Sequence, residues 1–216
     1  MITSWKEMPI GVFMKISEVN KSDYNDDDKL FHIAALLNNM DYEDFINLPL
    51  NESRDIIAKA AFMYNEPKAG KMKKTYVIGS RTYRVMRNMD DMTTAQYLNY
   101  QSIAERPVDE TMADLMAIVL IPEGKVYGDY DMQDVTEEIR DHFNIEDALS
   151  VADFFTRLFE KSMRRMRRYS DILLTAMEWK VRMECKDKEQ KEAVKTAMAL
   201  LREEILSTSG YPSSRR

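Results

Sequence analysis

Residues 75–85 read Thr-Tyr-Val-Ile-Gly-Ser-Arg-Thr-Tyr-Arg-Val and stand out as rich in β-formers in a mostly helical pattern. Two short runs, 75–78 and 82–85, flank a turn that contains glycine, so this stretch predicts a β-hairpin. A two-stranded hairpin alone is only marginally stable in water. We therefore expect the hairpin to pack on helices or to pair with another chain. Its candidate interaction residues are Tyr76, Ile78, Arg81, Tyr83 and Arg84.

Outward from the hairpin, apolar residues recur three and four positions apart, which predicts amphipathic helices. The first predicted helix is capped by Thr3 or Ser4 and carries Trp5. The second predicted helix begins at the acidic residues 26–28, which favour a helix N-terminus. A later helix is capped by Thr93 or Thr94 and carries apolar residues as far as Ile103. Phe45, Ile46 and Tyr64 are expected on buried faces. The other predicted helices cover residues 41–48, 52–64, 112–120, 134–143, 146–159 and 162–206.

These elements predict a mainly α fold: a multi-helix domain with one β-hairpin insertion and a long helical C-terminal region. The expected divisions are an N-terminal helical unit 1–66, the hairpin 67–88 and a second helical unit 89–160. A charged helical region, 161–206, and a flexible tail, 207–216, follow. Segment 89–97 resembles segment 5–13, so the second helical unit could duplicate the first. Chance similarity between amphipathic helices explains the resemblance nearly as well, and both interpretations stay open.

The composition narrows the classes of protein to consider. A hydrophobic fraction of 44% and a charged fraction of 31% in 216 residues argue against wholesale disorder. The net charge of −6 argues against a protein that coats nucleic acid. The single cysteine, Cys185, excludes an internal disulfide framework and fits a reducing compartment. No run of about 18 apolar residues occurs, so neither a membrane span nor, at the start, a signal peptide is expected.

Seventeen methionines are the unusual feature of the composition. Methionine is flexible and polarizable, so it fills irregular gaps in a core and also suits adaptable contact surfaces. One interpretation is a Met-rich helical core. The other is a protein that repacks against several partners or during assembly.

The spacing of potential ligand residues predicts no site for a metal or a phosphate. Asp23, Asn25 and Asp27 imitate the first ligands of a calcium loop. Asp28 then occupies the position that requires glycine, and Ala34 the position of the bidentate glutamate, so these acids are better explained as helix caps. No glycine-rich phosphate loop is present.

Catalytic groups are equally scarce. His32 and His142 are the only histidines, they lack the spacing of a zinc site, and each is expected on a helix in a structural or surface role. Cys185 has no activating motif around it. The sequence predicts no catalytic residue, no metal and no cofactor, and hence a protein that is not an enzyme.

The strongest local charge lies in residues 161–168. On a helix Arg164, Arg165 and Arg168 share one side, where guanidinium groups could bind phosphate or an acidic partner. The alternative is a solvated basic face balanced by Glu160 and Asp171. If these arginines bind phosphate, DNA is a possible partner beside an acidic protein.

Several strings, in this order, resemble a family of virion-associated or tail-assembly-chaperone-like proteins from tailed phages of gut Bacteroidales, including the crAss-like phages. The resemblance covers roughly residues 4–160. The strings are Trp5-x-x-Met8-x-x-Gly11-x-Phe13, residues 76–85, Met92-Thr-Thr-Ala-Gln96-Tyr97, and residues 121–125, 127–131 and 148–155.

The resemblance implies a non-enzymatic phage virion protein, either structural or packaged cargo, associated with portal, tail or capsid. It would be made in the host cytoplasm, reside in the virion in multiple copies, and bind other phage structural proteins and no membrane. The alternative within the same family is a tail-assembly chaperone that is absent from the mature virion. A nucleic-acid-binding regulator and an enzyme without a motif complete the hypotheses.

Overall fold

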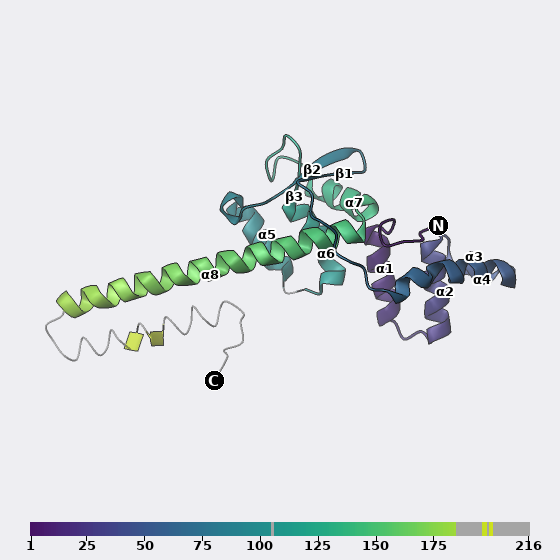
Figure 1. Cartoon of the computed structure of the whole chain (residues 1–216), viewed down its shortest axis with the longest axis horizontal. Helices are drawn as coiled ribbons and strands as arrows, with labels where there is room; N and C mark the ends of the chain where they lie inside the picture. The colour runs from purple at the N-terminus through teal and green to yellow at the C-terminus, as the bar shows by residue number, and fades with distance from the viewer. Residues whose placement is uncertain (105, 185–195, 198, 201–216) are drawn as a thin grey trace. The chain divides into compact units, whose positions relative to one another are not determined.

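The computed structural model describes residues 1–104, 106–184, 196–197 and 199–200, with only the backbone at 104, 163 and 166–184. The chain divides into two units, Met1–Thr156 and Arg157–Arg216. The predicted mainly α fold with a β-hairpin is confirmed (Figure 1). In order, the elements are α1 (Ile10–Lys21), α2 (Asp26–Leu37), α3 (Tyr42–Ile46), α4 (Leu50–Lys59), η1 (Ala60–Tyr64), β1 (Thr75–Ile78), β2 (Arg81–Val85), η2 (Met89–Asp91), α5 (Thr94–Ala104), α6 (Val108–Val119), β3 (Leu120–Pro122), α7 (Met132–His142) and α8 (Ile145–Glu184).

The hairpin is the first part of a three-stranded antiparallel sheet with the order β1-β2-β3. Gly79 opens its two-residue turn at φ 55°, a left-handed conformation that glycine adopts without strain. The sequence predicted a helix over residues 112–120 and no third strand, so β3 was missed. It is held where the Met86 N–H donates to the Val119 carbonyl at 2.9 Å and the Glu123 N–H donates to the Thr82 carbonyl at 2.8 Å.

One main hydrophobic core joins the sheet to the helices of the first unit. The alternate residues of β1 and β2 point inward, and α6 and the start of α8 supply most of the buried helical side chains. Helix α1 lies between α6 and α7 on one side and α2 to α4 on the other (Figure 1). The predicted divisions 1–66, 67–88 and 89–160 all contribute to this core. Its largest fully buried members are Tyr83, Phe155, Met8, Ile10, Leu37, Ile78, Met116, Leu120, Ile139 and Ile145.

A smaller core lies within the N-terminal helices. Ala34, Ala35 and Phe45 are buried there, and the partly buried residues around them are Phe31, Met40, Leu48, Ile56 and Ile57. Helix α2 begins as predicted at the acidic residues, and the Asn25 side chain caps it by accepting a bond from the Asp28 N–H at 2.9 Å.

The first helix starts later than the sequence predicted. Helix α1 begins at Ile10 with Pro9 as its N-cap, whereas Thr3 or Ser4 was expected to cap it. Proline disfavours a helical conformation at the preceding residue, so the chain through Met8 stays outside the helix. The freed Met8 carbonyl accepts a bond from the Ile145 N–H at 2.9 Å, which ties the N-terminus to the start of α8.

Two residues expected to be buried lie outside. Ile46 is 47% exposed, because α3 is a five-residue helix that turns only Phe45 toward the core. Tyr64 is 88% exposed. The helix before it changes to the tighter 3-10 form at Ala60, and three residues per turn rotate Tyr64 away from the predicted face.

The break that the sequence predicted between residues 159 and 162 is absent, because α8 runs without interruption from Ile145 to Glu184. No glycine or proline occurs in that span to end it. The helix reaches Thr156 in the first unit and continues in the second. Residues 185–195 and the predicted tail 207–216 lie outside the described residues.

The described methionines favour a core role. Met8, Met86, Met112 and Met116 are buried in the main core, and six more pack partly buried against it: Met14, Met63, Met72, Met89, Met92 and Met132. The duplication of the first helical unit stays a prediction.

Candidate functional site

The segment 67–88, which we call the basic hairpin segment, concentrates positive charge in an acidic protein. It contains no aspartate or glutamate, while the whole chain carries a net charge of −6. Its cations are Lys68, Lys71, Lys73, Lys74, Arg81, Arg84 and Arg87.

Two of these cations are neutralised within the first unit. Arg81 Nε lies 3.4 Å from Glu138 Oε2, and Lys73 Nζ lies 3.0 Å from Asp147 Oδ2. The other five are exposed, and none forms an ion pair with a carboxylate among residues 1–104 and 106–165. The surface of the hairpin is therefore electropositive.

Glu138 of α7 holds the turn of the hairpin. Its Oε2 accepts a bond of 2.5 Å from the Tyr83 hydroxyl, and its Oε1 accepts bonds from the Ser80 N–H at 3.0 Å and the Ser80 hydroxyl at 3.2 Å. A Cβ at Gly79 would lie 2.6 Å from Glu138 Oε1, so the close approach requires glycine. Glu138 thus anchors the turn of the hairpin to α7.

The electrostatics of this contact follow from burial and hydrogen bonding. Burial, then the bond to Glu138, raises the pKa of the Tyr83 hydroxyl far above its usual range. Burial alone would raise the pKa of Glu138. The bonds from Tyr83 and Ser80, with the charge of Arg81, outweigh it and lower that pKa. A neutral phenol therefore faces a carboxylate at neutral pH.

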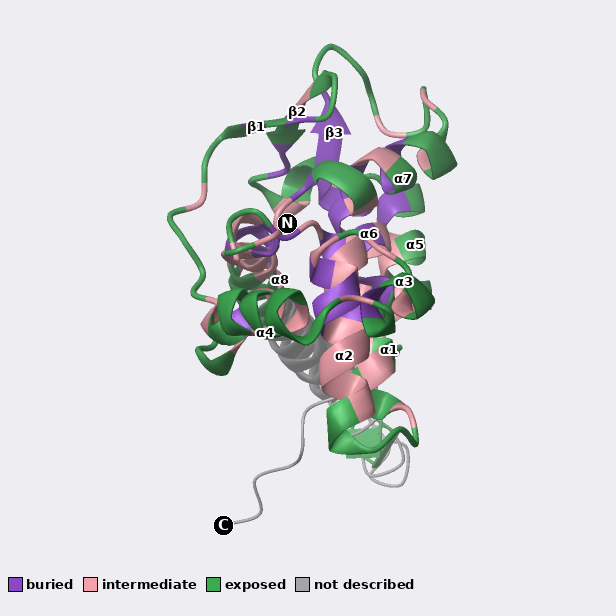
Figure 2. Ribbon diagram, turned by 90° about the vertical axis from the view of Figure 1, so that its right-hand side faces the viewer, coloured by how far each residue is buried: buried purple, intermediate pink, exposed green. Residues whose placement is uncertain are grey.

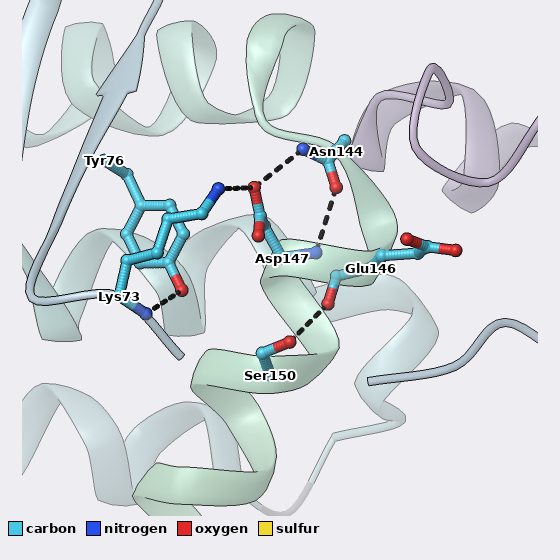
Figure 3. Close-up of polar contacts among 6 residues, drawn as sticks. All are labelled: Lys73, Tyr76, Asn144, Glu146, Asp147 and Ser150. Carbon is cyan, nitrogen blue, oxygen red and sulfur yellow. Dashed lines mark hydrogen bonds and ion pairs between the residues drawn. The ribbon is translucent and has the colours of Figure 1, made fainter. Parts of the chain in front are cut away.

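A second anchor lies where the segment enters β1 (Figure 3). The Lys73 N–H donates to the Tyr76 hydroxyl at 3.0 Å, and the Lys73 ammonium lies 5.2 Å from the centroid of the Tyr76 ring. Its ion-pair partner Asp147 lies in the first turn of α8, where Asn144 caps the helix by accepting a bond from the Asp147 N–H at 2.9 Å. Burial is the main cause that raises the pKa of Tyr76.

Strand β1 forms one edge of the sheet, and its outer side is open. The Val85 N–H bonds to the Lys74 carbonyl at 3.0 Å, and bonded and non-bonded pairs alternate in an antiparallel ladder. The peptide groups of Thr75 and Val77 therefore face away from β2. Among the described residues none bonds to them from outside the sheet.

The two edges of the sheet differ. Strand β3 is buried throughout, and Pro122 within it has no N–H to offer, whereas exposed and buried residues alternate along β1 (Figure 2). The Val77 side chain is 80% exposed. Only the β1 edge presents accessible strand groups beside exposed apolar surface.

The predicted interaction residues of the hairpin separate into two groups. Tyr76, Ile78 and Tyr83 are buried in the main core and are at most 4% exposed. Arg81 and Arg84 are exposed, and the Arg84 guanidinium donates to the Lys125 carbonyl at 3.2 Å. The prediction of an interacting hairpin stays a prediction, and its accessible part is the edge of β1. Sequence reasoning missed Thr75 and Val77, although Val77 alternates with two buried neighbours.

The predicted arginine row lies on α8 in the second unit. Arg164 and Arg165 are exposed, and Arg164 Nε donates to the Glu160 carbonyl at 3.4 Å. Arg168 lies in the helix, but its side chain is outside the described residues. Binding of phosphate or an acidic partner there stays a prediction.

The histidines take part in local packing. His32 stacks between Tyr24 and Tyr42, with ring centroids 4.6 and 3.8 Å away. His142 is exposed at the end of α7, near the hairpin turn. Across the described residues no three His, Cys, Asp or Glu side chains gather as a metal site would require. Cys185 lies outside them.

A cleft of about 550 Å³ opens between α5, α6 and α7. Arg106 and Arg140 line it together with the acids Asp114 and Glu137, over an apolar floor that includes Ile118. The opposite charges balance, so the lining favours no class of ligand. Within the described part of the chain, no helix has the length and apolar character needed to cross a membrane.

The basic hairpin segment, with its open strand edge, is thus the most distinctive surface of the first unit. Comparison with known proteins finds no match to this chain among protein-family models, curated proteins or solved structures.

Proposed function

We propose that the chain is a non-enzymatic component of a tailed-phage particle, structural or packaged cargo, that acts by binding other proteins of the particle at portal, tail or capsid. The observation that carries the binding role is the charge of the basic hairpin segment. Five of its cations are exposed and have no carboxylate partner among the described residues, so their charge is available to a partner protein.

The charge distribution also directs the approach of that partner. The chain outside residues 67–88 is strongly acidic, because the seven cations of the segment are included in a total of −6. An acidic surface is therefore repelled by most of this protein and attracted by the hairpin. Such patterning supports docking in one orientation, as an assembly component requires.

The anchoring of the hairpin supports the same role. Glu138 and Asp147 anchor the two ends of the hairpin to different helices. A surface held in place before binding loses little conformational entropy when it docks. The phage setting rests on the resemblance of residues 4–160 to virion-associated and chaperone-like proteins.

Quantitative mass spectrometry of purified particles, compared with infected cells, tests the setting. We expect the chain in the particles at a fixed ratio to the portal protein. Its presence in cells in complex with a tail component, together with absence from particles, would overturn the virion role in favour of the tail-assembly chaperone. Absence from both would reject both roles.

A charge-reversal variant tests the binding surface. Replacing Lys68, Lys71 and Lys74 by Glu should abolish incorporation into particles, whereas the same replacements of Lys6, Lys15 and Arg54, which are exposed in the N-terminal region, should not. Both variants change the net charge equally. Equal incorporation of the two would remove the hairpin from the proposal, and recovery of DNA with the particle-free protein through Arg164 and Arg165 would favour the nucleic-acid regulator.

A further inference from the structure

We infer that the open edge of β1 binds an extended, acidic segment of a partner protein, which joins the sheet as a fourth strand. This inference rests on the proposed function, since it assigns the partner's chemistry and the docking mode at the same surface. Three features of the edge support it: its free peptide groups, its charge and its exposed apolar side chain.

The peptide groups specify a strand as the ligand. Thr75 and Val77 each direct an N–H and a carbonyl away from β2. An extended peptide satisfies both kinds of group by continuing the ladder. A nucleic-acid backbone offers phosphate oxygens, which accept bonds from the N–H groups but repel the carbonyls between them. A protein strand is therefore the better match.

The charge specifies an acidic strand. Lys71 and Lys74 are exposed just before β1, and Lys68 precedes them. No carboxylate among the described residues pairs with these three ammonium groups. Carboxylates on the incoming strand supply the missing opposite charge.

The same charge excludes a second copy of this chain as the occupant. Antiparallel pairing of two β1 edges would bring two basic hairpin segments together, and like charges on paired strands are destabilising. Pairing of β1 with the β3 edge of another copy fails for a different reason. Pro122 removes a donor from that edge, and β3 is buried.

The exposed Val77 specifies the side-chain pattern of the partner. With 80% of its surface exposed, this side chain offers an apolar contact to the residue beside it on an added strand. Apolar and β-branched cross-strand pairs stabilise a sheet. The expected segment thus alternates acidic residues with β-branched apolar ones.

The test uses the full chain and a synthetic decapeptide of alternating Glu and Val residues. Amide hydrogen exchange followed by NMR should show Thr75 and Val77 unprotected in the free chain and protected with the peptide. Tyr76 and Ile78, already bonded to β2, should change little. A peptide of alternating Lys and Val, and the Glu peptide N-methylated at every second residue, should not protect the edge.

Two substitutions separate the edge from the fold. Val77→Pro removes an N–H that the hairpin does not use and should weaken peptide binding by at least about tenfold, since proline on an edge strand blocks an added strand. Val77→Thr keeps the N–H and should bind within about twofold, since it loses no backbone bond. Replacing Lys68, Lys71 and Lys74 by Glu should also weaken peptide binding, and this loss of affinity should become smaller as the salt concentration rises.

The outcomes are distinct. Three results would each overturn the inference. The first is binding of the Glu peptide without protection of Thr75 and Val77, and the second is no binding of that peptide. The third is protection of the two amides by a thymidine oligonucleotide added instead of the peptide. Because protection is measured on the wild-type chain, an unfolded Val77→Pro variant would leave the test intact. Failure here leaves the mass-spectrometric test of the particle role unaffected, and absence of the chain from particles leaves the edge measurement unaffected.

Discussion

Replacing Glu138 by alanine should release the hairpin from α7 and destabilise the first unit. The carboxylate accepts three hydrogen bonds from Tyr83 and Ser80 and pairs with Arg81. Its side chain is only 13% exposed, and Tyr83 is fully buried, so water cannot simply take its place. The perturbation therefore leaves a buried hydroxyl without an acceptor.

The magnitude follows from these contacts. A buried polar group without its partner costs about 1–3 kcal/mol, and a hydrogen bond to a charged group contributes about 1.5–3 kcal/mol. The Arg81 side chain is 46% exposed, and such pairs contribute roughly 0–1 kcal/mol. Since these contributions overlap, we expect a loss of roughly 2–4 kcal/mol in the free energy of unfolding.

The assay is urea unfolding followed by tryptophan fluorescence. Trp5 lies in the first unit, against Phe13 and Phe62. The sequence has two tryptophans, so a Trp179→Phe background leaves Trp5 as the single tryptophan. A double-mutant cycle with Tyr83→Phe isolates the buried bond. In the Tyr83→Phe background, Glu138→Ala should cost about 1–2 kcal/mol less, because no hydroxyl is stranded.

The control is Glu137→Ala, one residue away on the exposed side of α7. It should change the unfolding free energy by about 0.5 kcal/mol or less. If Glu138→Ala costs no more than this control, or the cycle shows coupling below about 0.3 kcal/mol, the Glu138 contact does not stabilise the hairpin.

The same contact gives a pH dependence. The pKa of Glu138 is lower in the folded chain than its ordinary value of about 4.3, so its contribution is complete above that value and is lost as the pH falls through the folded pKa. The stability difference between wild type and Glu138→Gln should be constant from neutral pH down to about 5 and shrink below it. A difference that stays constant down to pH 3 would contradict this assignment.

Three further substitutions test the packing around this surface by the same urea assay. Gly79→Ala and Gly124→Ala should each lower the free energy of unfolding by about 1–2 kcal/mol, because both glycines have a positive φ. Gly79→Ala should lower it further, because only there would the new Cβ meet a neighbouring side chain. Asn144→Ala should cost about 1 kcal/mol through loss of the cap of α8, and Asn144→Ser should restore most of it. Gly11→Ala should cost about 1–3 kcal/mol, because its Cβ would lie 3.0 Å from the Arg140 carbonyl oxygen, which no rotamer change can move.

Local signals predicted most of the fold. The hairpin was predicted because both of its strands and its glycine turn lie within 11 residues. Helix α2 was predicted from the acids at its start, and Asn25 caps it as such sequences do. The errors at Thr3 and Tyr64 were also local, since a proline and a 3-10 turn changed the helical register.

The missing strand could not be predicted in the same way. Residues 120–122 continue an apolar run from α6, and three residues are too few to show a strand period. Their extended conformation depends on bonds to Met86 and Thr82, more than 30 residues earlier in the chain. A proline at 122, which argues against a central strand, is compatible with an edge.

This missing strand also determines the candidate site. The positive charge of the segment could be seen in the sequence, but which of its strands faces solvent could not. If β3 had paired with β1, the peptide groups of Thr75 and Val77 would be covered and Arg84 would lie at the edge. Because it pairs with β2, the open edge falls beside Lys71 and Lys74.

The open edge lies beside cations that pair with no described carboxylate, and this arrangement has a physical consequence for the chain alone. Exposed strand edges promote aggregation, and lysines beside them are a common protection. The charges that keep two copies apart are the same ones that attract an acidic strand. Both effects therefore weaken together as salt is added, because at 0.1 M salt the interactions between exposed charges are largely screened beyond about 10 Å. Peptide binding and resistance to self-association should therefore decline together as the salt concentration rises, and a partner that tolerates high salt would have to hold the edge by backbone bonds and the contact with Val77.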